Sequence, residues 1–467
     1  MEMAAAAAGG LEVVVFPWLA FGHMIPFLEL SKRLAARGHA VAFVSTPRNL
    51  ARLPAVPAHL SARLRFVPLQ LPAVEGLPED AESTADVPPG KVELLKKAMD
   101  GLADPLASFL AAGRRPDWIV VDFCHHWVPA IADQHKVPCA ALLIFHAACI
   151  AFIGPRWAND AYPRTKPEDF TVPPKWMPFP STTVLLHHEA RQMLADNFGD
   201  NASGRSDTDR LWDVLERCRL TIHRSCRELE EPRIFTLISD LLRKPAVAAG
   251  ILLPRATDDN RHQILTWLDD QPPKSVIYVA LGSEAPLTLE SIHELALGLE
   301  LAGVGFFWAL RKPAGTTNFN NEQELLPAGF EERTRARGLV CTGWVPQVKA
   351  LAHGATAAFL THSGWGSTIE SFAVGLPLVM LPFLTDTPMI ARAMAERGIG
   401  VQVARDENDG SFDRDGIAAA VRRVMVEDEG KVLATNAMKL KELVVDEERQ
   451  EQYIQELEEH LRRYKDV

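Results

Sequence analysis

The sequence lacks several patterns that would indicate common classes of protein. Its six cysteines include no CxxC pair, which argues against a zinc site or a disulfide framework and predicts free thiols in a reducing compartment, the cytoplasm. No apolar run reaches the length of about 18 residues that a membrane-spanning helix needs, so we expect no membrane insertion. The net charge is −11 and no basic stretch alternates with aromatics, so nucleic acid is not an expected partner.

The length of 467 residues predicts two domains, because one hydrophobic core rarely organises more than about 250 to 300 residues. The first residues, MEMAAAAAGGLEVVVFPWLAF, contain Glu2 and Glu12 and no basic region. We therefore expect an Ala/Gly tail followed by a core strand, and not a signal peptide.

Short apolar runs alternate with helical patterns along most of the chain, which indicates α/β architecture with parallel sheets. We expect strands within 11–18, 40–46, 117–127, 138–145, 219–225 and 244–254, and a second series within 275–283, 306–311, 338–344, 357–362 and 377–383. Helices are expected over 24–40 (with Gly38 at its end), 128–135, 208–218, 289–302 and 367–374. The pattern predicts two Rossmann-like, doubly wound parallel-sheet domains facing a ligand cleft.

The domain boundaries follow from changes in composition. We expect an N-terminal domain over 1–247, a polar linker over 248–260 and a C-terminal domain over 261–445. The last helix, 446–467, has Ile454, Leu457, Leu461 and Tyr464 at helical spacing and is predicted to clasp the domains. Residues 155–210 are rich in Pro and small polar residues, and the sequence leaves open whether they form a substrate-side insert or a plain surface excursion.

The stretch THSGWGSTIE, residues 361–370, has two interpretations. A strand ends there, Gly364 and Gly366 allow close backbone approach, and a helix follows, so the first helical amides predict an anion site. Alternatively, Ser367 and Glu370 match the S-x-x-E capping box, which would engage both side chains within the helix.

Residues Trp344 to Thr387 read W-x-P-Q, then H, then F-L-T-H-x-G-W-x-S-x-x-E, then G-x-P, P and D. This frame resembles the signature box of plant UDP-dependent glycosyltransferases of the inverting GT-B type. The stretches PWLAFGHMIPFLELSKRLAARGH and VIYVALGS also resemble that family. FVSTPRN, FCHHW and YVALGSE are similar to its family-91 branch, whose members often glycosylate a sugar already present on a flavonoid or terpenoid.

The resemblance assigns the donor site residue by residue. It implies that Trp344 stacks on uracil, that the backbone of Val345 meets the edge of the base, and that Gln347 and Glu370 reach the ribose. It also implies roles for further residues: Ser283, His362, Ser367 and the helix-start amides of Trp365 and Gly366 at the pyrophosphate, and Asp386 and Thr387 at the donor sugar. No metal or cofactor is then required, because the helix end meets the charge of leaving UDP; the UDP-sugar is a co-substrate.

The resemblance also assigns the catalysis. His23 is expected in a loop after the first strand, where it takes the proton of the acceptor hydroxyl while Asp122 fixes its tautomer. Transfer would then proceed by single displacement with inversion. His125 and His126 are nearby rivals that need no catalytic role. The expected acceptor-binding residues are Phe123, His126, Phe145, Trp157, Met177 and Glu284.

Three positions depart from the family's usual box: Ser363 replaces a common Cys, Gly366 an Asn and Thr387 a Gln. Glucose is the predicted donor sugar, but rhamnose, galactose and xylose stay open. The predicted acceptor is a sugar on a steviol-type terpenoid or flavonoid glycoside, forming a 1,2-linkage, and the chain is expected to be a monomer. The departures also leave a binding protein with a decayed donor site as an alternative. A nicotinamide oxidoreductase is excluded, because the first turn has no G-x-G-x-x-G.

Overall fold

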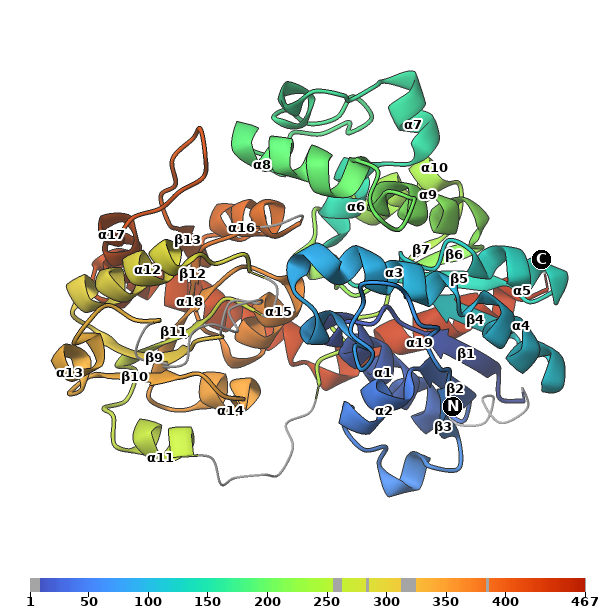
Figure 1. Ribbon diagram of the computed structural model, residues 1–467, viewed down its shortest axis with the longest axis horizontal. Helices are drawn as coiled ribbons and strands as arrows, with labels where there is room; N and C mark the ends of the chain where they lie inside the picture. The colour runs from blue at the N-terminus through green and yellow to red at the C-terminus, as the bar shows by residue number, and fades with distance from the viewer. Residues whose placement is uncertain (1–8, 255–262, 283–284, 312–324, 384–385, 467) are drawn as a thin grey trace. The chain divides into compact units, whose positions relative to one another are not determined.

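The computed structural model describes residues 9–254, 263–282, 285–311, 325–383 and 386–466 (Figure 1). The chain divides into two compact units. The first unit comprises Met1–Ala161, Asn197–Pro254 and Glu447–Val467, and the second comprises Tyr162–Asp196 and Arg255–Asp446. The sequence-based division assigns Tyr162–Asp196, hereafter the insert, to the N-terminal domain, whereas these residues belong to the second unit. It also places 248–254 in a linker and 446–467 in a separate helix, whereas residues up to Pro254 and Glu447–Val467 belong to the first unit.

The first unit contains a seven-stranded sheet in the order β3-β2-β1-β4-β5-β6-β7, and every strand pair described in it is parallel. Its strands are β1 (Glu12–Phe16), β2 (Ala40–Ser45), β3 (Leu64–Pro68), β4 (Trp118–Val121), β5 (Cys139–Leu143), β6 (Leu220–His223) and β7 (Ala246–Ala248). Its α-helices are α1 (Phe21–Ala36), α2 (Pro47–Arg52), α3 (Val92–Asp100), α4 (Ala103–Ala112), α5 (Val128–Gln134), α6 (Ala147–Ile153), α7 (Arg156–Ala161), α9 (Asp207–Arg217), α10 (Ile234–Leu242) and α19 (Glu447–Tyr464).

The terminal helix α19 completes the core of the first unit. Ile454, Leu457 and Leu461 are fully buried in the same cluster as residues of β1 and α1. The indole N–H of Trp118 on β4 donates to the carbonyl of Leu461 at 2.9 Å, and Figure 1 shows the red helix beside the blue strands. The apolar face that the sequence predicts for this helix therefore packs on the first sheet. Whether the helix also clasps the second unit stays a prediction.

The second unit contains a six-stranded sheet in the order β10-β9-β8-β11-β12-β13, again parallel in every described pair. Its strands are β8 (Val276–Ala280), β9 (Gly305–Ala309), β10 (Gly338–Cys341), β11 (Thr356–Thr361), β12 (Leu378–Met380) and β13 (Gly400–Gln402). Its α-helices are α8 (His187–Met193), α11 (Gln263–Asp269), α12 (Leu289–Ala302), α13 (Phe330–Thr334), α14 (Gln347–Ala352), α15 (Trp365–Val374), α16 (Thr387–Glu396), α17 (Arg414–Met425) and α18 (Asp428–Val444).

The doubly wound architecture predicted from the sequence is confirmed, and β3 and β13 are edge strands that the sequence did not predict. Helix α12 has the predicted bounds because both of its ends are encoded locally. The Thr288 hydroxyl accepts from the Ser291 N–H at 3.1 Å, and Gly303 ends the helix at φ +76°, which favours glycine.

Each sheet reverses its winding between two central strands, β1 and β4 in the first and β8 and β11 in the second. Ligands of doubly wound sheets bind outside the carboxyl ends of the strands at such a switch point. His23 follows β1 and Asp122 follows β4, while Gly282 follows β8 and His362 follows β11. The two switch points therefore coincide with the two groups of residues that the sequence singles out.

Candidate functional site

His23 and Asp122 form a hydrogen-bonded pair at the switch point of the first sheet. The imidazole Nδ1 lies 2.7 Å from the Asp122 Oδ2. This hydrogen-bonding distance is expected for residues that follow the paired strands β1 and β4. The Asp122 carboxylate is fully buried, whereas the His23 side chain is 14% exposed. The imidazole is thus held from its buried side and keeps a surface open to a ligand.

The remaining contacts of Asp122 hold it as an anion. Its Oδ2 also accepts from the Trp18 N–H at 3.0 Å, and its Oδ1 accepts from the Phe123 N–H at 2.8 Å. Burial alone would raise the pKa of Asp122, but the His23 imidazole, His125 and the Trp18 N–H lower it below its usual value. An ionised carboxylate only accepts hydrogen bonds, so it places the proton of neutral His23 on Nδ1 and leaves Nε2 as a base.

His23 lies in the first turn of α1, and its predicted position in a loop is wrong. The helix begins at Phe21, and the His23 and Met24 N–H groups donate to the Ala20 carbonyl at 2.9 and 2.8 Å. No side chain caps this end, so the sequence offered no cap to mark it. A helical backbone fixes the direction of the imidazole more firmly than a loop would.

Two of the predicted acceptor-binding residues lie beside His23. The rings of Phe123 and Phe145 are 5.6 and 5.9 Å from the imidazole and 6.0 Å from each other. Both residues are half-buried. Together they form an aromatic wall beside the His23 imidazole, which suits an apolar molecule.

The other predicted acceptor-binding residues have different surroundings. The Trp157 indole N–H donates to the Leu241 carbonyl at 2.9 Å, and Arg243 lies over the ring at 5.5 Å. Met177 is only 8% exposed and belongs to the insert in the second unit. Glu284 lies outside the described residues. An acceptor role for these residues stays a prediction.

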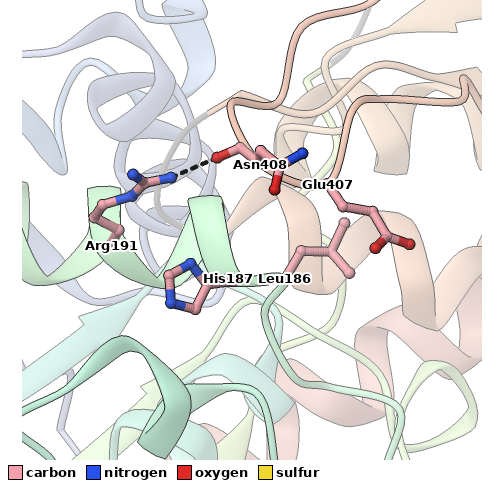
Figure 2. A pocket seen from close by; sticks show the side chains of 5 residues that line it. All are labelled: Leu186, His187, Arg191, Glu407 and Asn408. Carbon is pink, nitrogen blue, oxygen red and sulfur yellow. Dashed lines mark hydrogen bonds between the residues drawn. The ribbon is translucent and has the colours of Figure 1, made fainter.

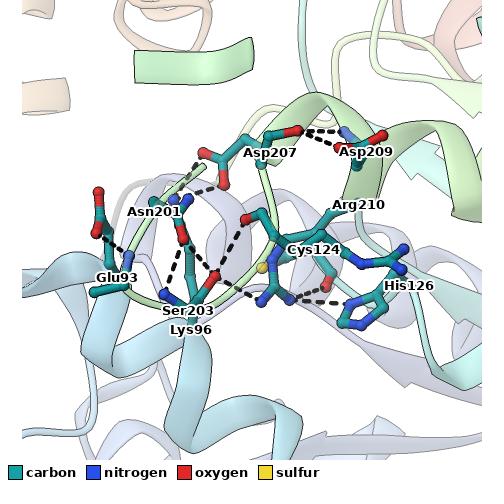
Figure 3. A network of polar contacts seen from close by, with 12 residues as sticks. Glu93, Lys96, Cys124, His126, Asn201, Ser203, Asp207, Asp209 and Arg210 are labelled. Carbon is teal, nitrogen blue, oxygen red and sulfur yellow. Dashed lines mark hydrogen bonds and ion pairs between the residues drawn. The ribbon is translucent and has the colours of Figure 1, made fainter. Parts of the chain in front are cut away.

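His126 belongs to a polar network centred on the fully buried Arg210 (Figure 3). The Arg210 guanidinium donates to both carboxylate oxygens of Asp100, at 2.7 and 2.6 Å, and to the His126 Nδ1 at 3.0 Å. Burial lowers the pKa of His126 although Asp100 raises it. Since Arg210 can only donate, the neutral His126 carries its proton on Nε2.

His125 is not a rival to His23. It is fully buried and packs edge-on against the Phe16 ring, with the ring centroids 4.4 Å apart. Burial lowers its pKa to about 3, against the weaker opposing effect of Asp122. Neither ring nitrogen has a hydrogen-bond partner among the residues the structure describes, so this histidine is a neutral core residue.

The second group of residues surrounds the N-terminus of α15. Gly364 is the N-cap, so no side chain caps this end of the helix. Ser363, just before it, has φ +67°, a left-handed conformation that is uncommon outside glycine. Among the described residues, its hydroxyl and the buried Nδ1 of His362 find no hydrogen-bond partner. Buried polar atoms without partners at a helix N-terminus are features of a site built for an anion.

Two glycines make room for His362. A Cβ on Gly282 would lie 2.7 Å from the imidazole Cε1, and a Cβ on Gly364 would lie 2.4 Å from its Nε2. Gly282 also has φ +78°. Burial lowers the pKa of His362 to about 4, so the imidazole is neutral near pH 7. Gly366, where a side-chain donor is missing, is half-buried in the first turn of α15.

The capping-box interpretation of Ser367 and Glu370 is wrong. Ser367 lies inside α15, because Gly364 takes the N-cap position. The Gln347 Nε2 instead donates to Glu370 at 2.7 Å and contacts the Ser367 hydroxyl at 3.5 Å. Gln347 in turn accepts from the Tyr278 hydroxyl at 3.2 Å. These side chains are therefore turned toward α14 and not toward the helix end.

Tyr278 is a supporting residue that the sequence did not single out. Its ring lies between Phe307 and Phe359, with centroid distances of 5.4 and 5.2 Å. Burial raises its pKa, so the hydroxyl keeps its proton and donates it to Gln347. The only available signal was a tyrosine in the otherwise aliphatic run VIYVA.

Trp344 and Trp365, both predicted at the UDP site, have opposite surroundings. Trp344 is 69% exposed, which leaves a large aromatic face uncovered, whereas Trp365 is 3% exposed and packs against Phe372. The Trp365 indole is therefore almost fully buried. Val345 is half-buried beside Trp344, and its carbonyl accepts from the Gln347 N–H at 2.9 Å.

The residues predicted for the donor sugar begin α16. Asp386 is the half-buried N-cap, and Thr387 is 7% exposed. The Thr387 hydroxyl oxygen accepts from the Phe383 N–H at 3.2 Å, so this side chain also binds the backbone that precedes the helix. Ser283, predicted at the pyrophosphate, lies outside the described residues.

A groove of about 440 Å³ lies elsewhere on the second unit (Figure 2). It is lined by Leu186, His187, Arg191, Glu407 and Asn408. None of these was predicted as a site residue. Within the described ranges, no group of three or more His, Cys, Asp or Glu could hold a metal ion, and no helix is long and apolar enough to cross a membrane. The six cysteines are free, and all but Cys341 are buried.

Comparisons with known proteins agree with this arrangement of residues. Residues 196–450 match the family model described as UDP-glucoronosyl and UDP-glucosyl transferase. The chain is 41% identical to UDP-glycosyltransferase 91C1 of Arabidopsis thaliana, over 97% of this chain and 96% of that protein. It is 37% identical to a soyasaponin III rhamnosyltransferase of Glycine max, over 97% and 96%.

Solved structures with the same fold include Os79 of O. sativa in complex with UDP. That structure superposes with a TM-score of 0.75 at 24% identity, covering 95% of this chain and 100% of the other. TcCGT1 in complex with UDP gives a TM-score of 0.80 at 22% identity, covering 97% and 100%. These matches confirm the GT-B fold. The family match and the curated relatives show that the chain is an enzyme that transfers sugar from a UDP-sugar to plant small molecules, and that it belongs to family 91 of the plant UDP-glycosyltransferases.

Proposed function

We propose that the enzyme transfers glucose from UDP-glucose, with inversion, to a hydroxyl of a sugar already present on a terpenoid or flavonoid glycoside. His23 is the general base, and the residues around the N-terminus of α15 hold the UDP. The observation that carries the mechanism is the 2.7 Å contact between the His23 Nδ1 and the buried Asp122.

The pair supports base catalysis because of how protons are distributed over it. The low pKa of Asp122 keeps the proton of neutral His23 on Nδ1, so that Nε2 is the nitrogen that takes the proton of the acceptor hydroxyl. The acceptor oxygen then bonds to the anomeric carbon of the sugar as the bond from that carbon to UDP breaks. The imidazolium that forms is stabilised by the Asp122 carboxylate. Attack from the face opposite the departing UDP inverts an α-linked donor to a β-glycoside.

The donor residues support recognition of UDP part by part. Trp344 offers a largely exposed ring on which uracil can stack. Glu370, which Gln347 orients, offers carboxylate oxygens for a ribose diol. The backbone amides at the start of α15 and the His362 imidazole suit the pyrophosphate. The charge that develops on leaving UDP is met by groups that are already in place.

The glycoside acceptor is supported by the names of relatives and by the aromatic wall. One relative, from Petunia hybrida, is named anthocyanidin-3-O-glucoside rhamnosyltransferase and is 34% identical to this chain. Two relatives from Stevia rebaudiana belong to the same family 91. Phe123 and Phe145 beside His23 suit an apolar aglycone. A steviol-type or flavonoid glycoside, glycosylated with a 1,2-linkage, is the acceptor we propose.

UDP-rhamnose is a second candidate donor. Thr387 stands where the family usually has Gln, and its hydroxyl oxygen already accepts from Phe383. A glucose-reading amide is thus missing, and two relatives are named as rhamnosyltransferases. UDP-galactose and UDP-xylose stay open for the same reason, although no named relative given above favours them.

Incubation of the enzyme with each UDP-sugar and a panel of glycosides tests the proposal. We expect UDP release with UDP-glucose and a glycosylated acceptor, and a new β-glucosidic bond with a 1,2-linkage by NMR. Turnover with UDP-rhamnose alone would replace the donor assignment. Transfer to aglycones but not to glycosides would overturn the acceptor assignment.

The monomeric state and the cytoplasmic location predicted from the sequence belong to the same proposal. The free cysteines support a reducing compartment. Light scattering on a size-exclusion column tests the first, with a mass near 51.5 kDa expected, and a fluorescent fusion in plant cells tests the second.

A further inference from the structure

The insert (Tyr162–Asp196) is joined to α16 by a buried ion pair. Glu189 of α8 pairs with Arg392 of α16, and their side chains are only 4% and 13% exposed. A buried pair is stable only if its other polar atoms are also satisfied. That condition is met, because Glu189 accepts from the Leu186 N–H at 2.8 Å and Arg392 donates to the Pro388 carbonyl at 2.7 Å.

Through Pro388 the ion pair reaches the beginning of α16. Pro388 is the second residue of this helix, directly after Thr387 and two residues after Asp386. Arg392 thus links the insert to the first turn of α16, which carries both residues predicted to read the donor sugar. Burial lowers the pKa of Arg392 although Glu189 raises it, which is the expected signature of a desolvated, paired cation.

A second arginine contacts the chain on the N-terminal side of α16, at Pro382 and Phe383. Arg405 donates to the carbonyls of Pro382 and Gly410, the latter at 2.5 Å, and lies over the Phe383 ring at 5.5 Å. The Phe383 N–H in turn donates to the Thr387 hydroxyl. The Pro382 carbonyl, before Asp386, and the Pro388 carbonyl, after Thr387, therefore both accept from guanidinium groups.

The insert is also fixed to the segment that carries Arg405. His188 contacts the Glu407 carbonyl at 3.3 Å, and Arg191 donates to the Asn408 carbonyl at 2.5 Å. Figure 2 shows the Arg191 contact beside the groove. Gly410 leaves room for His188, since a Cβ there would lie 2.4 Å from the imidazole Cδ2. Helix α8 thus contacts both α16 and the segment that carries Arg405 and Gly410.

We propose that Glu189, Arg392 and Arg405 form a positioning cluster that fixes Asp386 and Thr387 and thereby sets how strongly the enzyme discriminates between donor sugars. The inference rests on the proposed role of those two residues at the donor sugar. It gives the insert a function in donor selection, whereas the sequence left open whether it is a substrate-side segment or a plain surface excursion. None of the three positioning residues needs to touch the sugar.

The test replaces the ion pair and compares the affinity for UDP with the use of UDP-sugars. Glu189→Gln removes one charge and leaves Arg392 buried and unpaired, which is strongly destabilising. The double variant Glu189→Met with Arg392→Met removes both charges of the pair, so neither partner is left buried and unpaired, and it is expected to fold with nearly unchanged Tm. We expect its Kd for UDP to stay within about twofold of wild type, while KM for the preferred UDP-sugar rises about tenfold, the equivalent of one lost charged hydrogen bond.

The ratio of kcat/KM between the preferred donor and a second UDP-sugar should also fall by about tenfold in the double variant. KM for the glycoside acceptor should not change. Thr182→Ala is the matched control, because the Thr182 hydroxyl donates to Glu396 at 2.5 Å. This contact also joins the insert to α16, but at the end of the helix opposite to Asp386 and Thr387. The variant should therefore leave the ratio of kcat/KM between the two donors unchanged.

A folded double variant with wild-type donor ratio and KM would overturn the positioning role. Equal loss of UDP and UDP-sugar affinity would also overturn it, because that result indicates a general structural role. If wild-type enzyme binds no UDP, the proposed function itself fails, and the two failures are distinguishable by calorimetry on the wild type alone.

Discussion

The two switch points hold polar groups in opposite states. At the first sheet Asp122 is fully buried and accepts from His23, Trp18 and Phe123. At the second sheet the His362 Nδ1 and the Ser363 hydroxyl have no partner among the residues described, and Trp344 is 69% exposed. A satisfied pair is pre-organised for proton transfer, whereas unsatisfied donors and an uncovered ring are pre-organised for a ligand. In the proposed function, chemistry and donor binding therefore belong to different units.

The strongest test of this contrast is His23→Ala. General acid–base catalysis contributes about 10² to 10⁴ in rate, so kcat should fall by about a thousandfold at saturating donor and acceptor. His59→Ala, which alters an exposed histidine of the same unit, should have no effect. Loss of less than about tenfold in kcat would mean that another group takes the proton.

The sheets and the site residues at their strand ends follow from the sequence because both are local. Apolar runs give the strands, and parallel winding brings residues such as His23 and Asp122 to one edge. The start of α1 was missed because Ala20 provides no capping side chain, and the start of α15 was misplaced because Gly364 caps it without one. The grouping of the insert with the second unit rests on pairs distant in sequence, such as Glu189 with Arg392, which no local pattern encodes.

Trp344→Ala should weaken binding without changing the chemical step. Stacking of a base on an aromatic ring is worth about 1 to 3 kcal/mol, so Kd for UDP should rise about ten- to hundredfold while kcat at saturating donor is preserved. Trp344→Phe should restore most of the affinity. Leu301→Ala, at another exposed apolar position of the same unit, is the matched control. An unchanged Kd for Trp344→Ala would remove the proposed uracil platform.

Acid should destabilise both units through neutral histidines whose pKa is lowered in the folded chain. The pKa is lowered from 6.5 to about 3 for His125 and His223 in the first unit and to about 4 for His362 in the second. Below pH 6.5 the unfolded chain binds protons that the folded chain does not, so stability is complete above that pH and is lost as the pH falls. Each histidine contributes a slope of about 1.4 kcal/mol per pH unit.

Urea unfolding at pH 7, 6 and 5 measures this slope. In His125→Phe, the free energy of unfolding of the first unit should depend on pH with one proton fewer, a slope lower by about 1.4 kcal/mol per pH unit. Phe does not titrate and suits a site where the ring packs among aromatic neighbours. A slope that is the same in wild type and variant would show that His125 is not a buried neutral residue.

The smallest expected effect concerns Thr387. Thr387→Gln supplies the amide that the family box usually has, and one neutral hydrogen bond is worth about 0.5 to 1.5 kcal/mol. We expect kcat/KM for UDP-glucose relative to UDP-rhamnose to rise about two- to tenfold. Thr387→Ser, which keeps the hydroxyl that accepts from Phe383, should leave the ratio as it is. A fall in the ratio for Thr387→Gln would show that UDP-glucose is used better with the smaller Thr387 side chain than with an added amide.

The division of labour between the two units is tested most directly by calorimetric titration of UDP into His23→Ala. If His23 acts only on the acceptor hydroxyl and the second unit alone holds UDP, Kd should stay within about twofold of the wild-type value, a difference below about 0.5 kcal/mol. A Kd at least tenfold weaker, about 1.4 kcal/mol, would contradict the account, because it would make His23 part of the donor site.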